Sequence, residues 1–438
     1  MRRNKAHEDL FLKLSLMFLA SIALTGVAVG DELKELRAKA VEATHKHDYP
    51  SAILLWTELL QKHPKDTNAY ASRGTVYVRT RDFTNALADL NRAVELDPKN
   101  PISYRARALV YDHKQDFENE IRDVNQAIQL DPKDASNFLL RGNAYAQKEN
   151  YDKAIDDFTL AIELNPKDNK PYKGRGRIYT IQKQLEKAVS DFNEAIRLKP
   201  EDPLAYYNRG RAYEQKGQLD DALKDFDEAI RLAPEDDQAY GFRGYLHFRK
   251  GEYQQSIKDF NQAIKYNQTN SITYDGRGYA YYKIGEFEKA ISDHTEAIRL
   301  NSTNSLAFHA RASAYSKQGE FVKAIEDHKK CLALNPKDAL AYNSLAWLFA
   351  TCKEASIRNG KGAVEAAQKA CELTEWKKWY CVGTLAASYA EAGDFEQAVK
   401  YQKQAMGMEG ITEKTRAEMQ KRLTLFEQHQ PTHEEPTL

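Results

Sequence analysis

The residues that could carry catalysis or bind a metal are few and widely spaced in this sequence. It has no Gly-rich phosphate loop, no nucleophile elbow and no His-Glu metal motif of the kind that places ligands on one helix. His45 and His47 are one residue apart, which is more typical of an exposed pair than of a metal site. His294 and His328 stand where Phe192 stands elsewhere, which indicates packing. The sequence therefore predicts neither an enzyme nor a cofactor or metal site.

All four cysteines lie near the end of the chain, at Cys331, Cys352, Cys371 and Cys381. Their spacing contains no close cysteine pair and no partnered histidine, which argues against a zinc site. Sequence alone cannot choose among the pairings that four cysteines allow. A Cys371–Cys381 disulfide is the preferred pairing, because both residues would flank one short connection between helices. Buried free thiols are the alternative.

These residues belong to an internal repeat with a period of 34. An Asp recurs from Asp89 to Asp327, always 16 residues after an Arg that precedes a small residue. Equal numbers of opposite charges at fixed positions predict a series of ion pairs, within a repeat or between neighbours. The Arg residues are Arg73, Arg107, Arg141, Arg175, Arg209, Arg243, Arg277 and Arg311.

The residue pattern within each repeat predicts two helices. Tyr206, Gly210 and Tyr213 are four and three residues apart, a spacing that places them on one helical face. Ala222, Phe226 and Ala229 repeat this pattern in a second helix, which Pro234 then ends. Helix hairpins with aromatic side chains filling gaps beside small residues are therefore expected.

This pattern resembles the tetratricopeptide repeat family, from about residue 33 to 412. The resemblance implies an all-α, right-handed superhelical solenoid that occupies residues 31–412, and the stacking of neighbouring hairpins would bury its core. We count eleven units, which begin at Leu33, Thr67, Pro101, Ala135, Asn169, Pro203, Asp237, Ser271, Ser305, Ala339 and Trp379.

By the same resemblance, the first helix of each unit lines a concave surface that holds a protein or an extended peptide. Its residues grade from basic to aromatic, which suits a partner with acidic and apolar side chains. A solvated face without a ligand is one alternative, and a structural protein that self-associates or braces a cell-envelope complex is another. The expected partner-binding residues are Arg105, Lys170, Lys173, Arg177, Tyr207, Arg211, Tyr245, Phe248, Tyr279, Tyr282 and His309.

Charge and the two ends of the chain complete the expectations. Lys and Arg number 64 and Asp and Glu number 64, so no basic excess suggests a nucleic acid or an anionic membrane as the partner.

Residues 1–30 have a basic start, an apolar stretch and small residues before Asp31, which predicts a secretory signal peptide and export to the periplasm or the cell exterior. The alternative is a membrane anchor at residues 10–30 with the repeats outside the cytoplasm. A capping helix is expected at 413–427 and a disordered tail at 428–438.

Overall fold

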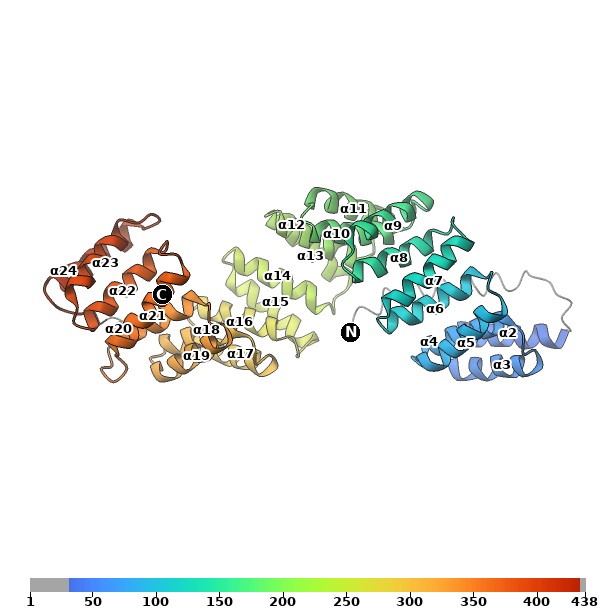
Figure 1. Ribbon diagram of the computed structural model, residues 1–438, viewed down its shortest axis with the longest axis horizontal. Helices are drawn as coiled ribbons and strands as arrows, with labels where there is room; N and C mark the ends of the chain where they lie inside the picture. The colour runs from blue at the N-terminus through green and yellow to red at the C-terminus, as the bar shows by residue number, and fades with distance from the viewer. Residues whose placement is uncertain (1–30, 434–438) are drawn as a thin grey trace. The chain divides into compact units, whose positions relative to one another are not determined.

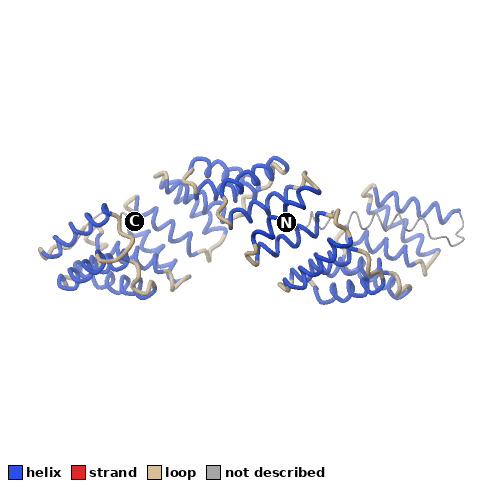
Figure 2. Tube along the Cα trace, turned by 90° about the horizontal axis from the view of Figure 1, so that it is seen from above, coloured by secondary structure: helices blue, strands red, loops and turns tan. Residues whose placement is uncertain are grey.

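The computed structural model describes residues 31–433, and these residues form 23 helices and no strand (Figure 2). The expected all-α fold of about eleven helix pairs is confirmed. The predicted signal segment, residues 1–30, lies outside the described residues, as do residues 434–438. Among the helices of residues 31–433, none is both long enough and apolar enough to cross a bilayer.

The chain divides into two compact units, with the boundary between Asp225 and Phe226 inside helix α13. In the first unit, successive helices pair as hairpins, and α8 with α9 is a clear example in Figure 1. Its helices are α2 (Asp31–His45), α3 (Tyr49–Lys62), α4 (Thr67–Arg79), α5 (Phe83–Leu96), α6 (Pro101–His113), α7 (Phe117–Leu130), α8 (Ala135–Gln147), α9 (Tyr151–Leu164), α10 (Asn169–Ile181), α11 (Leu185–Leu198) and α12 (Pro203–Gln215). Helix α13 (Leu219–Leu232) follows.

The second unit continues the same pairing and ends with a single helix. Its helices are α14 (Asp237–Arg249), α15 (Tyr253–Tyr266), α16 (Ser271–Lys283), α17 (Phe287–Leu300), α18 (Ser305–Lys317), α19 (Phe321–Leu334), α20 (Ala339–Thr351), α21 (Gly360–Leu373), α22 (Trp379–Glu391), α23 (Phe395–Met406) and α24 (Glu413–Glu427). Between α20 and α21, residues 352–359 form a longer connection than those of the other hairpins.

Local sequence sets where each hairpin begins and turns. At the start of α8, the Asp134 side chain accepts a hydrogen bond from the Ser136 backbone N–H, 2.9 Å away, and so caps the helix. The turn to α9 needs a left-handed residue, which is Glu149 with φ 58°. In later hairpins a glycine such as Gly217, φ 78°, takes that position and adopts this conformation without strain.

Aromatic rings and glycines join one hairpin to the next. Phe158 on α9 is buried, and its ring lies against Gly142 of its own hairpin and Gly174 of the next. Phe260 on α15 lies in the same way between Gly244 and Gly276. A side chain at any of these glycines would meet the ring, so the small residues set how closely neighbouring hairpins approach.

The C-terminal end of the array is covered by α24, which buries Met419, Leu423 and Phe426. Beyond this helix, Thr432 is buried and His433 Nε2 lies 2.9 Å from a carboxylate oxygen of Glu391 on α22. These two residues therefore lie against the array, whereas Gln428, His429 and Gln430 are exposed. The disordered tail expected at 428–438 stays a prediction.

Candidate functional site

The repeated Arg and Asp residues form eight ion pairs, each within one hairpin. In every pair the Arg Nε and Nη2 atoms donate to the two carboxylate oxygens of the Asp, over distances of 2.5–2.9 Å. All eight Asp residues are buried. The predicted series of ion pairs is confirmed, and we call it the Arg–Asp ladder.

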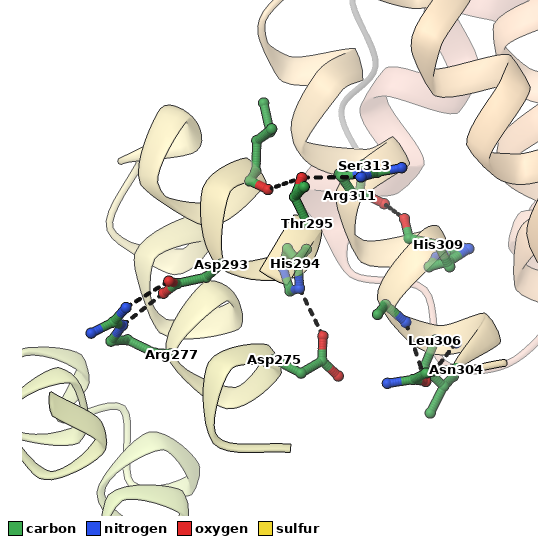
Figure 3. A network of polar contacts seen from close by, with 12 residues as sticks. Asp275, Arg277, Asp293, His294, Thr295, Asn304, Leu306, His309, Arg311 and Ser313 are labelled. Atoms are coloured by element: carbon green, nitrogen blue, oxygen red, sulfur yellow. Dashed lines mark hydrogen bonds and ion pairs between the residues drawn. The ribbon is translucent and has the colours of Figure 1, made fainter. Parts of the chain in front are cut away.

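The ladder also links neighbouring hairpins. The remaining guanidinium nitrogen, Nη1, donates to a side chain 16 residues earlier, in the preceding hairpin. Arg141 reaches Asn125 at 2.6 Å, and Arg311 reaches Thr295 at 3.0 Å (Figure 3). Each Arg also stacks on aromatic rings of its own helix, as Arg209 does on Tyr206 and Tyr213. These contacts fully occupy the Arg side chains, so the ladder has a structural role.

Two of the five basic residues expected to bind a partner form ion pairs within the chain. Arg105 forms an ion pair with Asp134, and Lys173 forms one with Asp202. Both acids lie 29 residues later in the chain and cap the first helix of the next hairpin. The charges of Arg105 and Lys173 are therefore paired within the chain, and their role in partner binding stays a prediction. Sequence reasoning missed these pairs, because a helix-capping role is enough to explain an Asp at positions 134 and 202.

The other basic candidates are more accessible. Arg177 and Arg211 are exposed on the first helices of successive hairpins, α10 and α12, and Lys170 is half-buried.

The expected aromatic residues differ widely in exposure. Tyr207 is buried, at 8% exposed, whereas Tyr245 is 46% exposed with Arg249 stacked on its ring. Phe248 and Tyr282 are half-buried, each against an aromatic residue of the next helix. Burial raises the pKa of the Tyr282 phenol.

Tyr279 is half-buried and meets the ring of His294 edge-on at 5.1 Å. His294 in turn lies 2.7 Å from Asp275, as Figure 3 shows. Burial, with the nearby charge of Asp275, raises the pKa of Tyr279.

A cleft of about 630 Å³ opens between α20, α22 and α24 in the second unit. Three aromatic residues, Trp347, Trp379 and Tyr380, line it from the first helices of the last two hairpins. Helix α24 adds charged side chains to the wall, of which three are basic and one is acidic: Lys414, Lys421, Arg422 and Glu418. Sequence reasoning missed this cleft, because one wall comes from a helix outside the repeat pattern.

Trp347 is the cleft residue with a buried and, in the described chain, unpaired hydrogen-bond donor. It is 5% exposed, Arg422 lies over its ring at 4.8 Å, and within residues 31–433 its indole N–H has no hydrogen-bond acceptor. A buried donor without an acceptor is costly, and a ligand carbonyl or carboxylate would satisfy it. Trp347 also lines a second, small cavity of about 30 Å³ together with Tyr282, one of the expected aromatic residues.

One further group of chemically capable side chains lies near His309. His309, Cys331 and Asp338 each offer one metal-ligand atom, and these atoms lie within 4.8 Å of one another. Cys331 follows His309 by 22 positions and Asp338 follows Cys331 by 7, so the three residues do not form a short metal-binding motif in the sequence. The 29-residue interval from His309 to Asp338 is, however, the same as in the Arg105–Asp134 and Lys173–Asp202 pairs.

All four cysteines are buried free thiols in the described chain. Cys371 and Cys381 belong to the same buried cluster, so the two residues expected to pair are brought together but are not bonded. Burial raises the pKa of the Cys371 thiol to about 12 and that of Cys381 to about 11. These thiols are protonated and unreactive at neutral pH.

Models of the tetratricopeptide repeat match the chain along most of its length. A model described as "Tetratricopeptide repeat" matches residues 37–101, 72–135 and 207–272, and a second of that description matches 138–168 and 305–338. One described as "TPR repeat" matches 176–217 and 278–319. This chain belongs to the tetratricopeptide repeat family. Such repeats typically mediate contacts between proteins and are generally non-catalytic.

Several solved structures are similar to parts or most of this chain at low sequence identity. YrrB, described as a repeat protein with an unusual peptide-binding site, is 23% identical, with a TM-score of 0.38, over 42% of this chain and 95% of its own. A repeat protein from Parabacteroides merdae is 22% identical, with a TM-score of 0.47, over 57% of this chain and 99% of its own. The Cut9–Hcn1 structure is 14% identical, with a TM-score of 0.46, over 95% of this chain and 92% of that one. No curated protein matches the sequence.

Proposed function

We propose that this protein is a non-catalytic adaptor that holds an extended segment of another protein in the cleft between α20, α22 and α24. The observation that carries the proposal is the cleft itself, with Trp347, Trp379 and Tyr380 on its walls. Trp and Tyr are enriched among residues that dominate binding energy, because they bury a large apolar area with few rotatable bonds.

The charges of the cleft indicate the kind of segment it takes. Lys414, Lys421 and Arg422 outnumber Glu418, which leaves the wall formed by α24 with a net positive charge. An acidic segment complements this wall, and its carbonyl or carboxylate oxygens would accept the unpaired indole N–H of Trp347. The partner is therefore an extended peptide with alternating acidic and apolar side chains. Tyr282, Phe248 and Tyr245 extend the surface along earlier first helices of the same unit.

Binding of defined peptides tests this proposal. Two labelled synthetic peptides share their Leu and Phe residues, but one carries Glu and the other Lys at the remaining positions. Fluorescence anisotropy should show tighter binding of the acidic peptide, and added salt should weaken it. Trp379→Ala should weaken binding at least about tenfold, since a buried aromatic anchor contributes more than about 1.4 kcal/mol.

Charge variants locate the binding site. Lys414→Glu with Lys421→Glu should reverse the preference between the two peptides, whereas Lys167→Glu, an exposed charge in the first unit, should leave it unchanged. Equal binding of both peptides, or wild-type affinity in Trp379→Ala, would rule the cleft out as the site. Concentration-dependent oligomers in light scattering, with no peptide binding, would instead favour a self-associating structural protein.

We further propose that the repeats act outside the cytoplasm, in the periplasm or the cell exterior. The sequence of residues 1–30 supports this, with its basic start, apolar stretch and small residues before Asp31. N-terminal sequencing of the mature protein after cell fractionation tests the proposal. A start at Asp31 in the exported fraction supports cleavage. An intact N-terminus in the membrane fraction supports an anchor, and an intact N-terminus in the cytoplasm contradicts export.

A further inference from the structure

His309, Cys331 and Asp338 converge from three successive elements of the second unit. His309 is on α18, Cys331 is on α19, and Asp338 caps the start of α20. Their ligand atoms lie within 4.8 Å of one another, whereas the ligands of a tetrahedral Zn²⁺ lie about 3.5 Å apart, given bonds of about 2.0–2.3 Å. Side-chain rotations that move these atoms by about 1 Å would close the difference.

The cluster replaces residues that serve packing in other hairpins. The position of Cys331 is Ala in the preceding units, as at Ala263 and Ala297. The position of His328, which lies beside the cluster, is Phe at Phe192 and Phe260. Packing of this fold is therefore satisfied without these side chains. His294 takes the position of His328 in the eighth hairpin, but its ring there pairs with Asp275. Only the ninth hairpin combines a thiol at the Ala position with imidazoles at residues 309 and 328.

Two of the three residues are held in place by the surrounding structure. Asp338 Oδ1 accepts the backbone N–H of Ala341 at 3.0 Å, and this bond directs Oδ2 toward the Cys331 sulfur, 3.5 Å away. Cys331 is fully buried. Hydrogen bonds of this kind orient ligands in metal sites and raise the affinity of the site.

His328 provides a second, independent observation that points to a ligand in this region. Its side chain is 1% exposed, and its ring centre lies 5.1 Å from that of His309. Among residues 31–433, the Nδ1 atoms of His309 and His328 have no hydrogen-bond partner. Two buried imidazole nitrogens left unpaired side by side are costly, and a cation that one or both could coordinate removes the cost.

We propose that His309, Cys331 and Asp338 bind one Zn²⁺ ion, with His328 as the adjacent fourth donor. A donor set of one sulfur, one or two imidazole nitrogens and one carboxylate oxygen suits Zn²⁺ better than the all-oxygen preference of Mg²⁺ or Ca²⁺. On binding, the Cys331 thiol releases its proton to solvent and coordinates as the thiolate. The ion ties the ninth hairpin to the start of the tenth, so it stabilises their junction.

Titration with Co²⁺ and Zn²⁺ tests the proposal. The full chain is purified without a histidine tag and is first treated with a chelator that is then removed. Co²⁺ should bind at one equivalent and give a thiolate-to-cobalt charge-transfer absorption, which added Zn²⁺ abolishes. Zn²⁺ should also raise the melting temperature. Cys331→Ala should lose the absorption and the melting shift, with zinc affinity lowered more than the roughly 10–100-fold cost of losing an outer-shell partner.

Matched variants make the outcome decisive. Cys331→Ala places the residue of the neighbouring hairpins at this position, so it should fold, and circular dichroism in chelator checks this. Cys371→Ala removes a buried thiol outside the cluster and should keep both metal signals. His309→Asn should weaken binding as Cys331→Ala does. A wild-type protein without the charge-transfer absorption, or a Cys331→Ala variant with unchanged zinc affinity, would overturn the site.

Discussion

Phe158 lies so close to Gly174 of the following hairpin that a Cβ atom at residue 174 would be 2.7 Å from Cζ of the ring. The ring is itself buried, so it has little room to move. We expect Gly174→Ala to destabilise the protein by about 1–3 kcal/mol through overpacking, less a helix-propensity gain of about 1 kcal/mol. The urea midpoint of unfolding measures the net loss.

Gly241→Ala is the matched control for this substitution. Gly241 also lies inside a first helix, α14, but a Cβ there has no neighbouring atom within 4 Å in the described chain. Only the propensity gain remains, so this variant should be more stable than wild type by up to about 1 kcal/mol. Shifts of the same sign in the two variants would contradict the role of Gly174 in setting the approach of the hairpins.

Breaking one pair of the Arg–Asp ladder should cost far more than breaking a surface pair. Arg141→Gln leaves the buried carboxylate of Asp157 without its guanidinium partner, and the expected loss is about 3–5 kcal/mol. Arg197→Gln breaks the exposed Arg197–Glu194 pair and should cost about 0–1 kcal/mol. Chemical denaturation compares the two, and similar losses would refute a structural role for the ladder.

Glu120 should make stability depend on pH. It is 2% exposed, and burial, with a smaller contribution from the charge of Asp112, raises its pKa to about 9. The unfolded chain loses this proton near pH 4.5, whereas the folded chain keeps it to about pH 9. The raised pKa of Glu120 therefore contributes fully to stability below about pH 4.5, where the carboxyl group is protonated in both states. This contribution is lost as the pH rises toward 9.

Glu120→Gln, which cannot ionise, tests this dependence. The variant should gain stability over wild type as the pH rises from 5 to 9, by about 4 kcal/mol between pH 5 and pH 8 if the full shift is expressed. Melting temperatures across this range measure the difference, and Glu118→Gln, an exposed neighbour, should show no such trend. A constant difference between Glu120→Gln and wild type would show that the carboxyl group is already ionised in the folded protein.

The four cysteines should react with a thiol reagent only after unfolding. All four are buried, and burial raises the pKa of each thiol, so thiolate is scarce in the native protein. We expect negligible reaction under native conditions in the presence of Zn²⁺ or of a chelator, and four thiols per chain in denaturant. Two thiols in denaturant without reductant would instead support the Cys371–Cys381 disulfide.

The ladder could be predicted from sequence, because Arg141 and Asp157 recur at one fixed interval and their charges demand a partner. The pairing of Lys173 with Asp202 could not, because Asp202 already has a local explanation as a helix cap. The cleft was missed because Lys414 and Lys421 lie on a helix outside the repeat. Periodicity reveals contacts that every hairpin repeats, and it hides those made once.

Each ladder Arg donates a hydrogen bond to the preceding hairpin, and these bonds limit how the length of this protein can change. Arg175 donates to Thr159, and the equivalent residue one unit earlier is Asn125, which already accepts from Arg141 in the same way. Excision of residues 135–168 would therefore bring Arg175 beside a ready acceptor. Duplication of one unit leaves every such bond intact, whereas a change of any other length breaks the register. The molecule can thus grow or shrink in whole modules, and its reach can be tuned without a new interface.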